Sequence, residues 1–330
     1  MRMERDVLYI ILASLLLMVI IPWTAGQLSE DIFFEWPFFF EVAIGGLLSG
    51  VMYSLVALGF VLIFKASGVF NFAQGAMVLF AALTLVGIHE MGVPMWVAII
   101  LTLFVMVLLA IAIEKVVLRH LVNQEPIILF MATIGIAYFL DGFGQTIWGS
   151  EVKILDLGIP NEPGFYFDGQ ILINDFDLVA ALIASVLVIA LALFFQYTRI
   201  GRALRAVADD HQAALSVGIP LQHIWTIVWS VAGMVGLVAG IMWGSKLGVQ
   251  FSLALIALKA LPVLILGGFT SVPGAIIGGL LIGAGEKIAE VFLAPMIGGG
   301  IEDWFAYMLA LAFLVFRPQG LFGEKIIERV

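Results

Sequence analysis

The sequence predicts an all-α fold, a polytopic transmembrane helical bundle of about ten spans with both termini cytoplasmic. Three observations predict it. Hydrophobic residues make up 63% of the 330 residues and charged residues only 12%, whereas a soluble domain carries about 25% charged residues. Apolar stretches recur with only short polar breaks between them. Basic residues collect in some of these breaks and acidic residues in others. Residues 1–330 are therefore interpreted as a single membrane domain.

The spans follow from the length of helix that crosses the hydrocarbon core, about 20 apolar residues with about 17–25 tolerated. The predicted spans are 7–23, 43–64, 76–91, 95–113, 127–148, 178–197, 224–244, 254–269, 274–293 and 303–316. The first is ambiguous, because Arg2 and Arg5 before an apolar run are also typical of a secretory signal peptide. A retained extra span is the preferred interpretation of residues 7–23.

The basic residues give the orientation, because Lys and Arg are retained on the cytoplasmic side of a membrane. Eleven of the 15 fall on one face if the N-terminus is cytoplasmic: Arg2, Arg5, Lys65, Lys115, Arg119, Arg199, Arg202, Arg205, Arg317, Lys325 and Arg329. The loop at 149–177 is acidic and is predicted to be extracytoplasmic, as an ordered cap or a mobile flap. The loop at 198–223 is predicted to be cytoplasmic. The expected location is a bacterial-type inner membrane.

Several function classes are disfavoured by what the sequence lacks. The net charge of -9 and the separation of acids from bases argue against a nucleic-acid partner. The chain has no cysteine, and its four histidines show no metal-ligand spacing, so no metal site is expected. No phosphate-binding Gly-x-x-x-x-Gly-Lys-Ser/Thr motif is present, so ATP hydrolysis would need another polypeptide. We expect no catalytic residues and no cofactor.

The cytoplasmic stretch at 198–223 is predicted to contain a short helix of its own. Asp209 and Asp210 suit its N-cap and first turn, Gly218 suits a left-handed position just after its end, and Pro220 prevents continuation. The alternative is an amphipathic helix that Arg199, Arg202 and Arg205 hold against anionic headgroups. Spacing alone leaves both open.

Two interruptions of the apolar pattern are candidates for a translocation pathway. Asn71, Gln74 and Gly75 separate two apolar runs, and non-helical backbone inside a membrane is tolerated only where protein or a water-lined cavity surrounds it. An ordinary polar turn at the cytoplasmic surface is the alternative. Further along, Gly267, Gly268 and Ser271 are also pathway candidates, although close helix packing is the default interpretation of glycines there.

Charges inside predicted spans are unfavourable in lipid and need an explanation. Lys259, Glu286 and Lys287 are the three such residues, and all lie toward the outer half of the membrane in this topology. Glu286 is expected to form a structural ion pair with either lysine. The alternative is a role facing the substrate.

Several segments together resemble one known family, the permeases of branched-chain amino acid ABC importers. The similar segments are GVMYSLVALG at 50–59, GVFNFAQG at 68–75, YTRIGRALRA at 197–206, QAALSVG at 212–218, LGGFTSVPGAIIGG at 266–279 and RPQGLFG at 317–323. The chain departs from the family pattern at Gln212, where a glutamate is general, and at Thr270, where a glycine is usual. The likeness extends from about residue 46 to residue 323.

The resemblance implies a permease without ATPase activity of its own. Its expected partners are ABC ATPase subunits, a second homologous permease subunit, an extracytoplasmic solute-binding protein and the lipid bilayer. Asp209, Asp210, Gln212, Ala213, Ala214 and Gly218 would then couple the chain to the ATPases. The implied substrates are branched-chain amino acids, with urea or short amides as an alternative. A stand-alone secondary transporter or channel is the alternative of another class, although no clear central acid supports it.

The predicted orientation is testable, because the chain contains no native cysteine that would react. A cysteine introduced at Asp168 should react with an impermeant maleimide in intact spheroplasts, and one at His211 should not. The reverse labelling pattern would show that the orientation is wrong.

Overall fold

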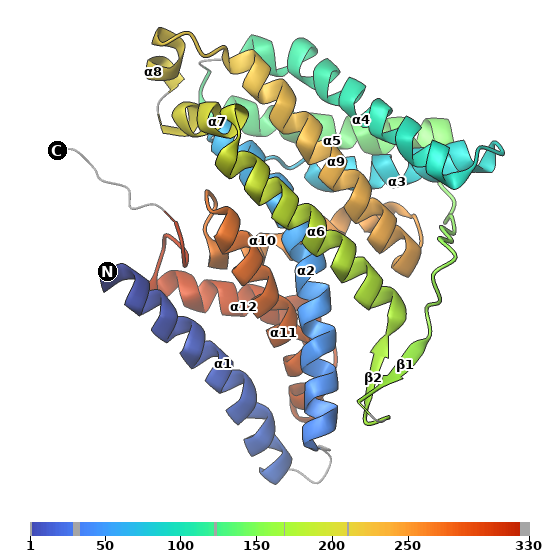
Figure 1. Ribbon diagram of the computed structural model, residues 1–330, viewed down its shortest axis with the longest axis vertical. Coiled ribbons are helices and arrows are strands. Elements are labelled where there is room, and N and C mark those ends of the chain that lie inside the picture. Colours follow the sequence, from blue (N-terminus) through green and yellow to red (C-terminus); the bar gives the residue numbers. More distant parts are fainter. Residues whose placement is uncertain (1, 29–33, 122–123, 168, 210, 324–330) are drawn as a thin grey trace. The chain divides into compact units, whose positions relative to one another are not determined.

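The computed structural model describes residues 2–28, 34–121, 124–167, 169–209 and 211–323 (Figure 1). These parts are almost entirely helical, with one short β-hairpin. The elements are α1 (Arg2–Leu28), α2 (Trp36–Ser67), α3 (Gln74–Glu90), α4 (Met95–Val116), the 3-10 turn η1 (Leu118–Leu121), α5 (Pro126–Trp148), β1 (Pro163–Tyr166), β2 (Ile171–Asn174), α6 (Asp175–Tyr197), α7 (Arg199–Asp209), α8 (His211–Ser216), α9 (Leu221–Leu247), the 3-10 turn η2 (Phe251–Leu255), α10 (Ile256–Gly267), α11 (Val272–Ile297) and α12 (Ile301–Phe316).

The polytopic all-α class agrees with this structure, but the count of ten spans is not confirmed. Within the described residues, six helices are long and apolar enough to cross a membrane, or seven if one bent pair counts as a single span. That pair comprises 251–267 and 272–297, which meet at an angle of 114°. With a rise of about 1.5 Å per residue, the 12 residues of α10 are too short to cross a core of about 30 Å. Residues 254–269 and 274–293 are thus not two simple spans.

The chain divides into two compact units. Unit 1 comprises 1–54, 159–185 and 259–330, and unit 2 comprises 55–158 and 186–258. Helices α2, α6 and α10 each contribute residues to both units. Each unit has its own buried contacts.

Unit 1 is built on a close antiparallel contact between α2 and α11. Small residues face each other at two levels, Gly46 against Gly283 and Gly50 against Gly279. A Cβ atom at Gly46 would lie 2.7 Å from the Gly283 carbonyl oxygen, closer than real contacts allow. The hydroxyl of Ser54 adds a hydrogen bond to the Ile276 carbonyl oxygen at 3.3 Å. Close backbone approach of this kind is how small residues hold helices together in lipid.

The N-terminal helix α1 packs against α11 at the edge of unit 1 and leaves most of its own surface exposed. Its residues Met18 and Ala25 contact a buried cluster that includes Phe39 of α2 and Phe292 of α11. Residues 7–23 therefore form part of a helix with tertiary contacts in this chain. Their retention in the mature protein stays a prediction.

Unit 2 is organised around α3, which contacts α4, α5, α9 and η2. Residues 74–87 of α3 are all buried, which explains why a helix of only 17 residues is apolar on every side. Glycines again allow the backbones of neighbouring elements to approach closely. A Cβ at Gly240 of α9 would lie 2.7 Å from the Val78 carbonyl oxygen, and one at Gly75 would overlap the Ala254 carbonyl oxygen.

The structure gives the loop at 149–177 an ordered element, the antiparallel hairpin of β1 and β2, which belongs to unit 1. Its register pairs Phe165 with Leu172 and Tyr166 with Ile171. The cap alternative from the sequence therefore describes residues 163–167 and 169–174 better than a flap.

The α2–α11 contact predicts the effect of adding one methyl group. Gly50→Ala should lower the free energy of unfolding by about 1–3 kcal/mol, because its Cβ would overlap the Gly279 carbonyl oxygen. Gly45→Ala is the matched control, since a Cβ there meets no atom within 4 Å. The measurement is the thermal midpoint of the purified protein in detergent. Equal midpoints for the two variants would contradict this account of the packing.

Candidate functional site

The Asn71 interruption lies between α2 and α3 as a buried, non-helical turn of unit 2. Asn71 and Gln74 are both fully buried. The Asn71 side-chain oxygen accepts the backbone N–H of Ala73 at 3.0 Å. The backbone N–H of Phe72 donates to the Thr133 hydroxyl of α5 at 3.2 Å. These side chains replace the hydrogen bonds that a continuous helix would make, so the two carboxamides at this turn are packed inside the protein.

Gln74 begins α3 and is only partly satisfied. Its Nε2 donates to the Ala232 carbonyl oxygen of α9 at 3.3 Å. Its Oε1 is buried and has no hydrogen-bond partner within the part of the chain that the structure describes. A Cβ at Gly59 would lie 2.5 Å from Nε2, so Gly59 leaves the room that the amide occupies. An unmatched polar atom inside an apolar unit is unfavourable, which keeps Gln74 a candidate for function.

The second set of pathway candidates forms the sharp turn between α10 and α11 in unit 1. Gly268 has a φ of 104°, and the Ser271 hydroxyl caps α11 by accepting the Gly274 N–H at 3.0 Å. Gly267 passes so close to Gly274 that a Cβ on either would overlap the other's backbone. These residues therefore make a tight structural turn.

A segment far along the chain completes this turn. The N–H groups of Leu321 and Phe322 donate to the carbonyl oxygens of Leu266 and Gly267 at 2.8 and 3.1 Å. These carbonyls end α10 and have no partner within their own helix. The two similar segments at 266–279 and 317–323 are thus one structural feature. Sequence analysis did not predict that they meet.

Unit 1 also contains a network of charges around one buried carboxylate, that of Glu286. Lys259 of α10 is at its centre, with its Nζ 3.0 Å from Glu286 Oε1 of α11. The same Nζ lies 3.3 Å from both Glu302 Oε1 and Asp303 Oδ1 at the start of α12. Lys287 Nζ pairs with Glu302 Oε2 at 3.1 Å. Of the two pairings open to Glu286 from the sequence, the structure therefore shows the one with Lys259.

The most buried member of this network is Glu286, whose side chain is 1% exposed. Its Oε1 also accepts the hydroxyl of Tyr53 at 3.1 Å. Its Oε2 has no partner among the described residues. Glu290 stabilises the start of α12 differently, because its two carboxylate oxygens accept the N–H groups of Gly300 and Glu302. Carboxylates suit this position because the N-terminus of a helix carries positive partial charge.

Sequence analysis missed Tyr53, Glu302 and Asp303 as members of the network, and Glu290 as the acceptor of the N–H groups at the start of α12. A signal was present for two of them. Glu302 and Asp303 follow a run of glycines and open an apolar run, which is the pattern of a helix N-terminus with acidic residues in its first turn. Nothing in the sequence connected these two acids to Lys259, which lies more than 40 residues earlier.

The cytoplasmic stretch forms two helices of unit 2, and arginines fasten the first to α6. Arg205 of α7 donates to the carbonyl oxygens of Phe195 and Gln196 at 2.8 and 3.3 Å. Arg202 donates to the Tyr197 carbonyl oxygen at 3.3 Å. These carbonyls end α6. Arg202 and Arg205 thus bind the protein's own backbone, which weakens the alternative in which they hold a helix against headgroups.

Helix α8 ends as the sequence suggests. Gly218 has a φ of 83°. Its N–H donates to the Leu215 carbonyl oxygen at 3.0 Å, and the N–H of Ile219 donates to that of Ala214 at 3.0 Å. This pair of bonds is the Schellman motif, which a left-handed glycine makes possible.

The other residues expected to couple the chain to a partner differ in exposure. Gln212 and Ala213 are exposed, but Ala214 is 2% exposed and faces its own chain. Leu215 and Val217 are exposed apolar residues beside them. Asp209 is the last residue of α7 and does not lie in the short helix itself, whereas Asp210 lies outside the described residues. The exposed surface of α8 is therefore shifted from the one the sequence suggested.

Comparison with protein families identifies the chain. The family model described as the permease component of branched-chain amino acid transport systems matches residues 42–317. The chain belongs to this permease family. Helix α1 precedes the matched region, whereas both units, the α10–α11 turn and α8 lie largely within it.

Named relatives agree with this family. The chain is 26% identical to the high-affinity branched-chain amino acid transport system permease protein LivH of Salmonella typhimurium, over 89% of this chain and 98% of that protein. It is 28% identical to the permease protein BraD of Pseudomonas aeruginosa, over 88% of this chain and 98% of that protein. Among solved structures, PsaBC from Streptococcus pneumoniae in complex with Fab aligns with a TM-score of 0.43 and 12% identity, covering 82% of this chain and 89% of that one. That likeness is too low to carry an argument.

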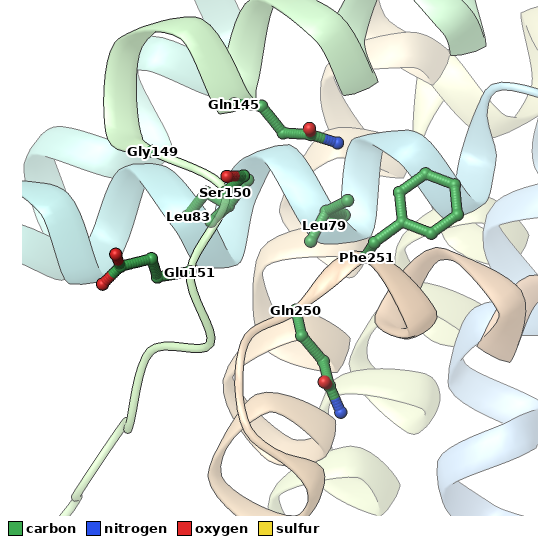
Figure 2. A pocket seen from close by; sticks show the side chains of 8 residues that line it. All are labelled: Leu79, Leu83, Gln145, Gly149, Ser150, Glu151, Gln250 and Phe251. Atoms are coloured by element: carbon green, nitrogen blue, oxygen red, sulfur yellow. The ribbon is translucent and has the colours of Figure 1, made fainter.

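Unit 2 of this permease has one small pocket with polar side chains in its lining (Figure 2). It has a volume of about 50 Å³. Its polar side chains include Gln145, Glu151 and Gln250. Figure 2 shows that these three point in different directions, and the Gln250 amide bonds to the nearby Leu247 carbonyl oxygen at 3.3 Å. Polar groups that bind one small ligand converge on it, so this pocket is not favoured as a substrate site.

The charge network makes a prediction about stability in this permease. Lys259→Met should lower the free energy of unfolding by up to about 3–5 kcal/mol, because Glu286 is left buried without its cation. The double variant Lys259→Met/Glu286→Gln should recover much of that loss. Lys287→Met is the control and should cost about 1 kcal/mol or less, since its pair with Glu302 is partly exposed. Thermal unfolding in detergent measures all three, and equal effects of both lysine variants would contradict this ranking.

Proposed function

We propose that this chain is the membrane-spanning permease subunit of an ATP-binding-cassette importer that carries branched-chain amino acids across a bacterial-type inner membrane. Its membership of the permease family is the observation that carries the proposal. The named relatives are high-affinity branched-chain amino acid permeases over nearly their whole length. The urea and short-amide alternative has no comparable support.

The proposed partners are separate ATPase subunits, a second homologous permease subunit and an extracytoplasmic solute-binding protein. Helix α8 is the proposed contact with the ATPases. It is exposed at Gln212, Ala213 and Leu215, and Val217 just after it is exposed too. Its end is fixed by the Schellman bonds of Gly218. A short helix with a fixed end and an exposed apolar side suits docking into a groove on another protein.

The proposed mechanism is alternating access, in which closure of the ATPases moves α8 and shifts the helices that line the path. The chain itself supplies no chemistry in this mechanism. It binds, orients and passes the substrate, while the ATPase subunits hydrolyse ATP. We propose that the 149–177 loop faces the outside and the 198–223 loop the cytoplasm. Gln74 is the pathway candidate that we retain, since its Oε1 is buried without a partner among the described residues.

The coupling role of α8 predicts the behaviour of two variants. Gly218→Val should misplace α8, because a β-branched residue at a φ of 83° is strained by about 1 kcal/mol or more. Leu215→Trp should overpack a groove on a partner by about 1–3 kcal/mol, whereas on a lipid-facing helix it should be neutral or favourable. Both variants should reach the membrane in normal amounts but fail to co-purify with the ATPase subunits.

The functional measurement is ATP-dependent uptake of labelled leucine by the complete importer in proteoliposomes. The wild-type importer should transport leucine, and the two α8 variants should not. Val315→Trp is the matched control, since Val315 is an exposed apolar residue of α12 outside this segment, and it should transport normally. Normal uptake by both α8 variants would reject the coupling role, and no uptake by the wild-type importer would reject the function.

A further inference from the structure

The β1–β2 hairpin of unit 1 has one buried and one exposed face. Side chains alternate along a strand, and here Ile171 and Ile173 point to the buried face. Phe165 and Leu172 are direct cross-strand partners on the other face. Phe165 is 74% exposed, and Phe167, just beyond β1, is 70% exposed. The result is an exposed apolar patch, defined here as Phe165, Phe167 and Leu172.

Two side-chain hydrogen bonds fix the hairpin that carries the patch. The backbone N–H of Leu172 donates to Glu41 Oε2 of α2 at 2.9 Å. The Tyr166 hydroxyl donates to Asp175 Oδ1 at the start of α6 at 2.6 Å, and this hydrogen bond raises the pKa of the Tyr166 phenol above its ordinary value. Strand β2 ends at Asn174 and α6 begins at the next residue (Figure 1). Exposed aromatic residues on such a preordered element lose little entropy on binding.

The backbone at Phe167 is strained. Its φ is 52°, the one positive φ of a non-glycine residue in the described part of the chain. Bulky residues rarely adopt this left-handed region, which Gly, Asn and Asp tolerate. Strain of this kind is concentrated at functional sites. The Phe167 backbone serves the hairpin turn, because its carbonyl oxygen accepts the N–H of Gln170 at 3.2 Å. Its side chain is solvent-exposed, so the side chain is the feature to explain.

We propose that Phe165, Phe167 and Leu172 form a docking surface for the extracytoplasmic solute-binding protein, through an apolar pocket with basic residues around it. The sequence from 159 to 177 has four acidic residues and no basic residue, so the patch lies in an acidic surrounding. Aromatic anchors inside a charged rim are typical of protein interfaces. The inference rests on the proposed function and on the outside position of this loop.

Charge also argues against a lipid surface as the occupant of the patch. Segments that bind the membrane interface combine aromatic residues with lysine or arginine, which are attracted to anionic headgroups. The hairpin has the opposite charge, so anionic lipid would repel it. A soluble protein with basic residues around an apolar pocket satisfies both the aromatic and the acidic parts of the surface.

The test uses the complete importer in nanodiscs and its purified solute-binding protein loaded with leucine. Phe165→Ser and Phe167→Asn should each raise the Kd for the binding protein by about 10-fold or more. Ile154→Ser is the matched control, because Ile154 is an exposed apolar residue of the same loop outside the hairpin, and its Kd should not change. Wild-type affinity in both hairpin variants would overturn the proposal.

Phe167→Asn also separates docking from structure. Asparagine tolerates a positive φ, so the hairpin should resist proteolysis at least as well as in the wild type while the Kd rises. A purely structural role of Phe167 would lower the resistance to proteolysis as the Kd rises, and that result would overturn the proposal. If the wild-type importer takes up leucine but these variants bind normally, the docking surface is wrong and the proposed function stands.

A fluorescent label distinguishes the lipid occupant. Because the chain has no cysteine, Gln170→Cys gives a single site for an environment-sensitive dye in the hairpin turn. Its emission should match that of a water-exposed dye in nanodiscs of phosphatidylethanolamine and phosphatidylglycerol, and should shift to the blue when the binding protein is added. A blue shift already present without the binding protein would show membrane insertion and overturn the proposal.

Discussion

The structure depends on one constraint, that backbone polar groups removed from water must find partners inside the protein. Continuous helices meet it automatically, so each break in a helix needs a specific solution. At the α10–α11 turn the solution comes from the far end of the chain, where Leu321 and Phe322 bond to the last carbonyls of α10. At the α2–α3 turn it comes from the side chains of Asn71 and Thr133. Both breaks therefore depend on hydrogen bonds from particular residues elsewhere in the chain.

The same constraint governs the buried charges. A lone carboxylate at Glu286 would be strongly unfavourable, so Lys259 and Tyr53 lie against it. Lys259 also reaches Glu302 on α12. The charge network thus joins four helices, α2, α10, α11 and α12. Of these, α10 has 12 residues and α12 has 16, so both are shorter than the about 20 residues that a spanning helix needs. Unit 1 combines this network with the glycine contact of α2 and α11, so charge and close packing stabilise the same helices.

Sequence patterns predicted local features better than long-range ones. Gly218 was predicted from a short-range rule of helix ends, and its φ agrees. The class of membrane protein followed from hydropathy and was confirmed. The span count was not, because hydropathy measures apolar length and cannot tell a bent pair from two spans. The partners of Gly267 and Lys259 could not be predicted from the sequence, since they lie tens of residues away and only folding brings them together.

The geometry of unit 2 explains how movement of α8 would reach the membrane helices. On one side, α7 is fixed to the end of α6 by Arg205, and Gly201 packs so closely that a Cβ there would overlap the Phe195 carbonyl oxygen. On the other side, the Schellman end of α8 is followed by Pro220, the N-cap of α9. The α6–α7 and α8–α9 connections are thus both short and hydrogen-bonded. Packed and hydrogen-bonded elements can carry coupling between distant sites. If α8 docks on the ATPases as proposed, its displacement would therefore reach α6 through α7 and would reach α9 directly.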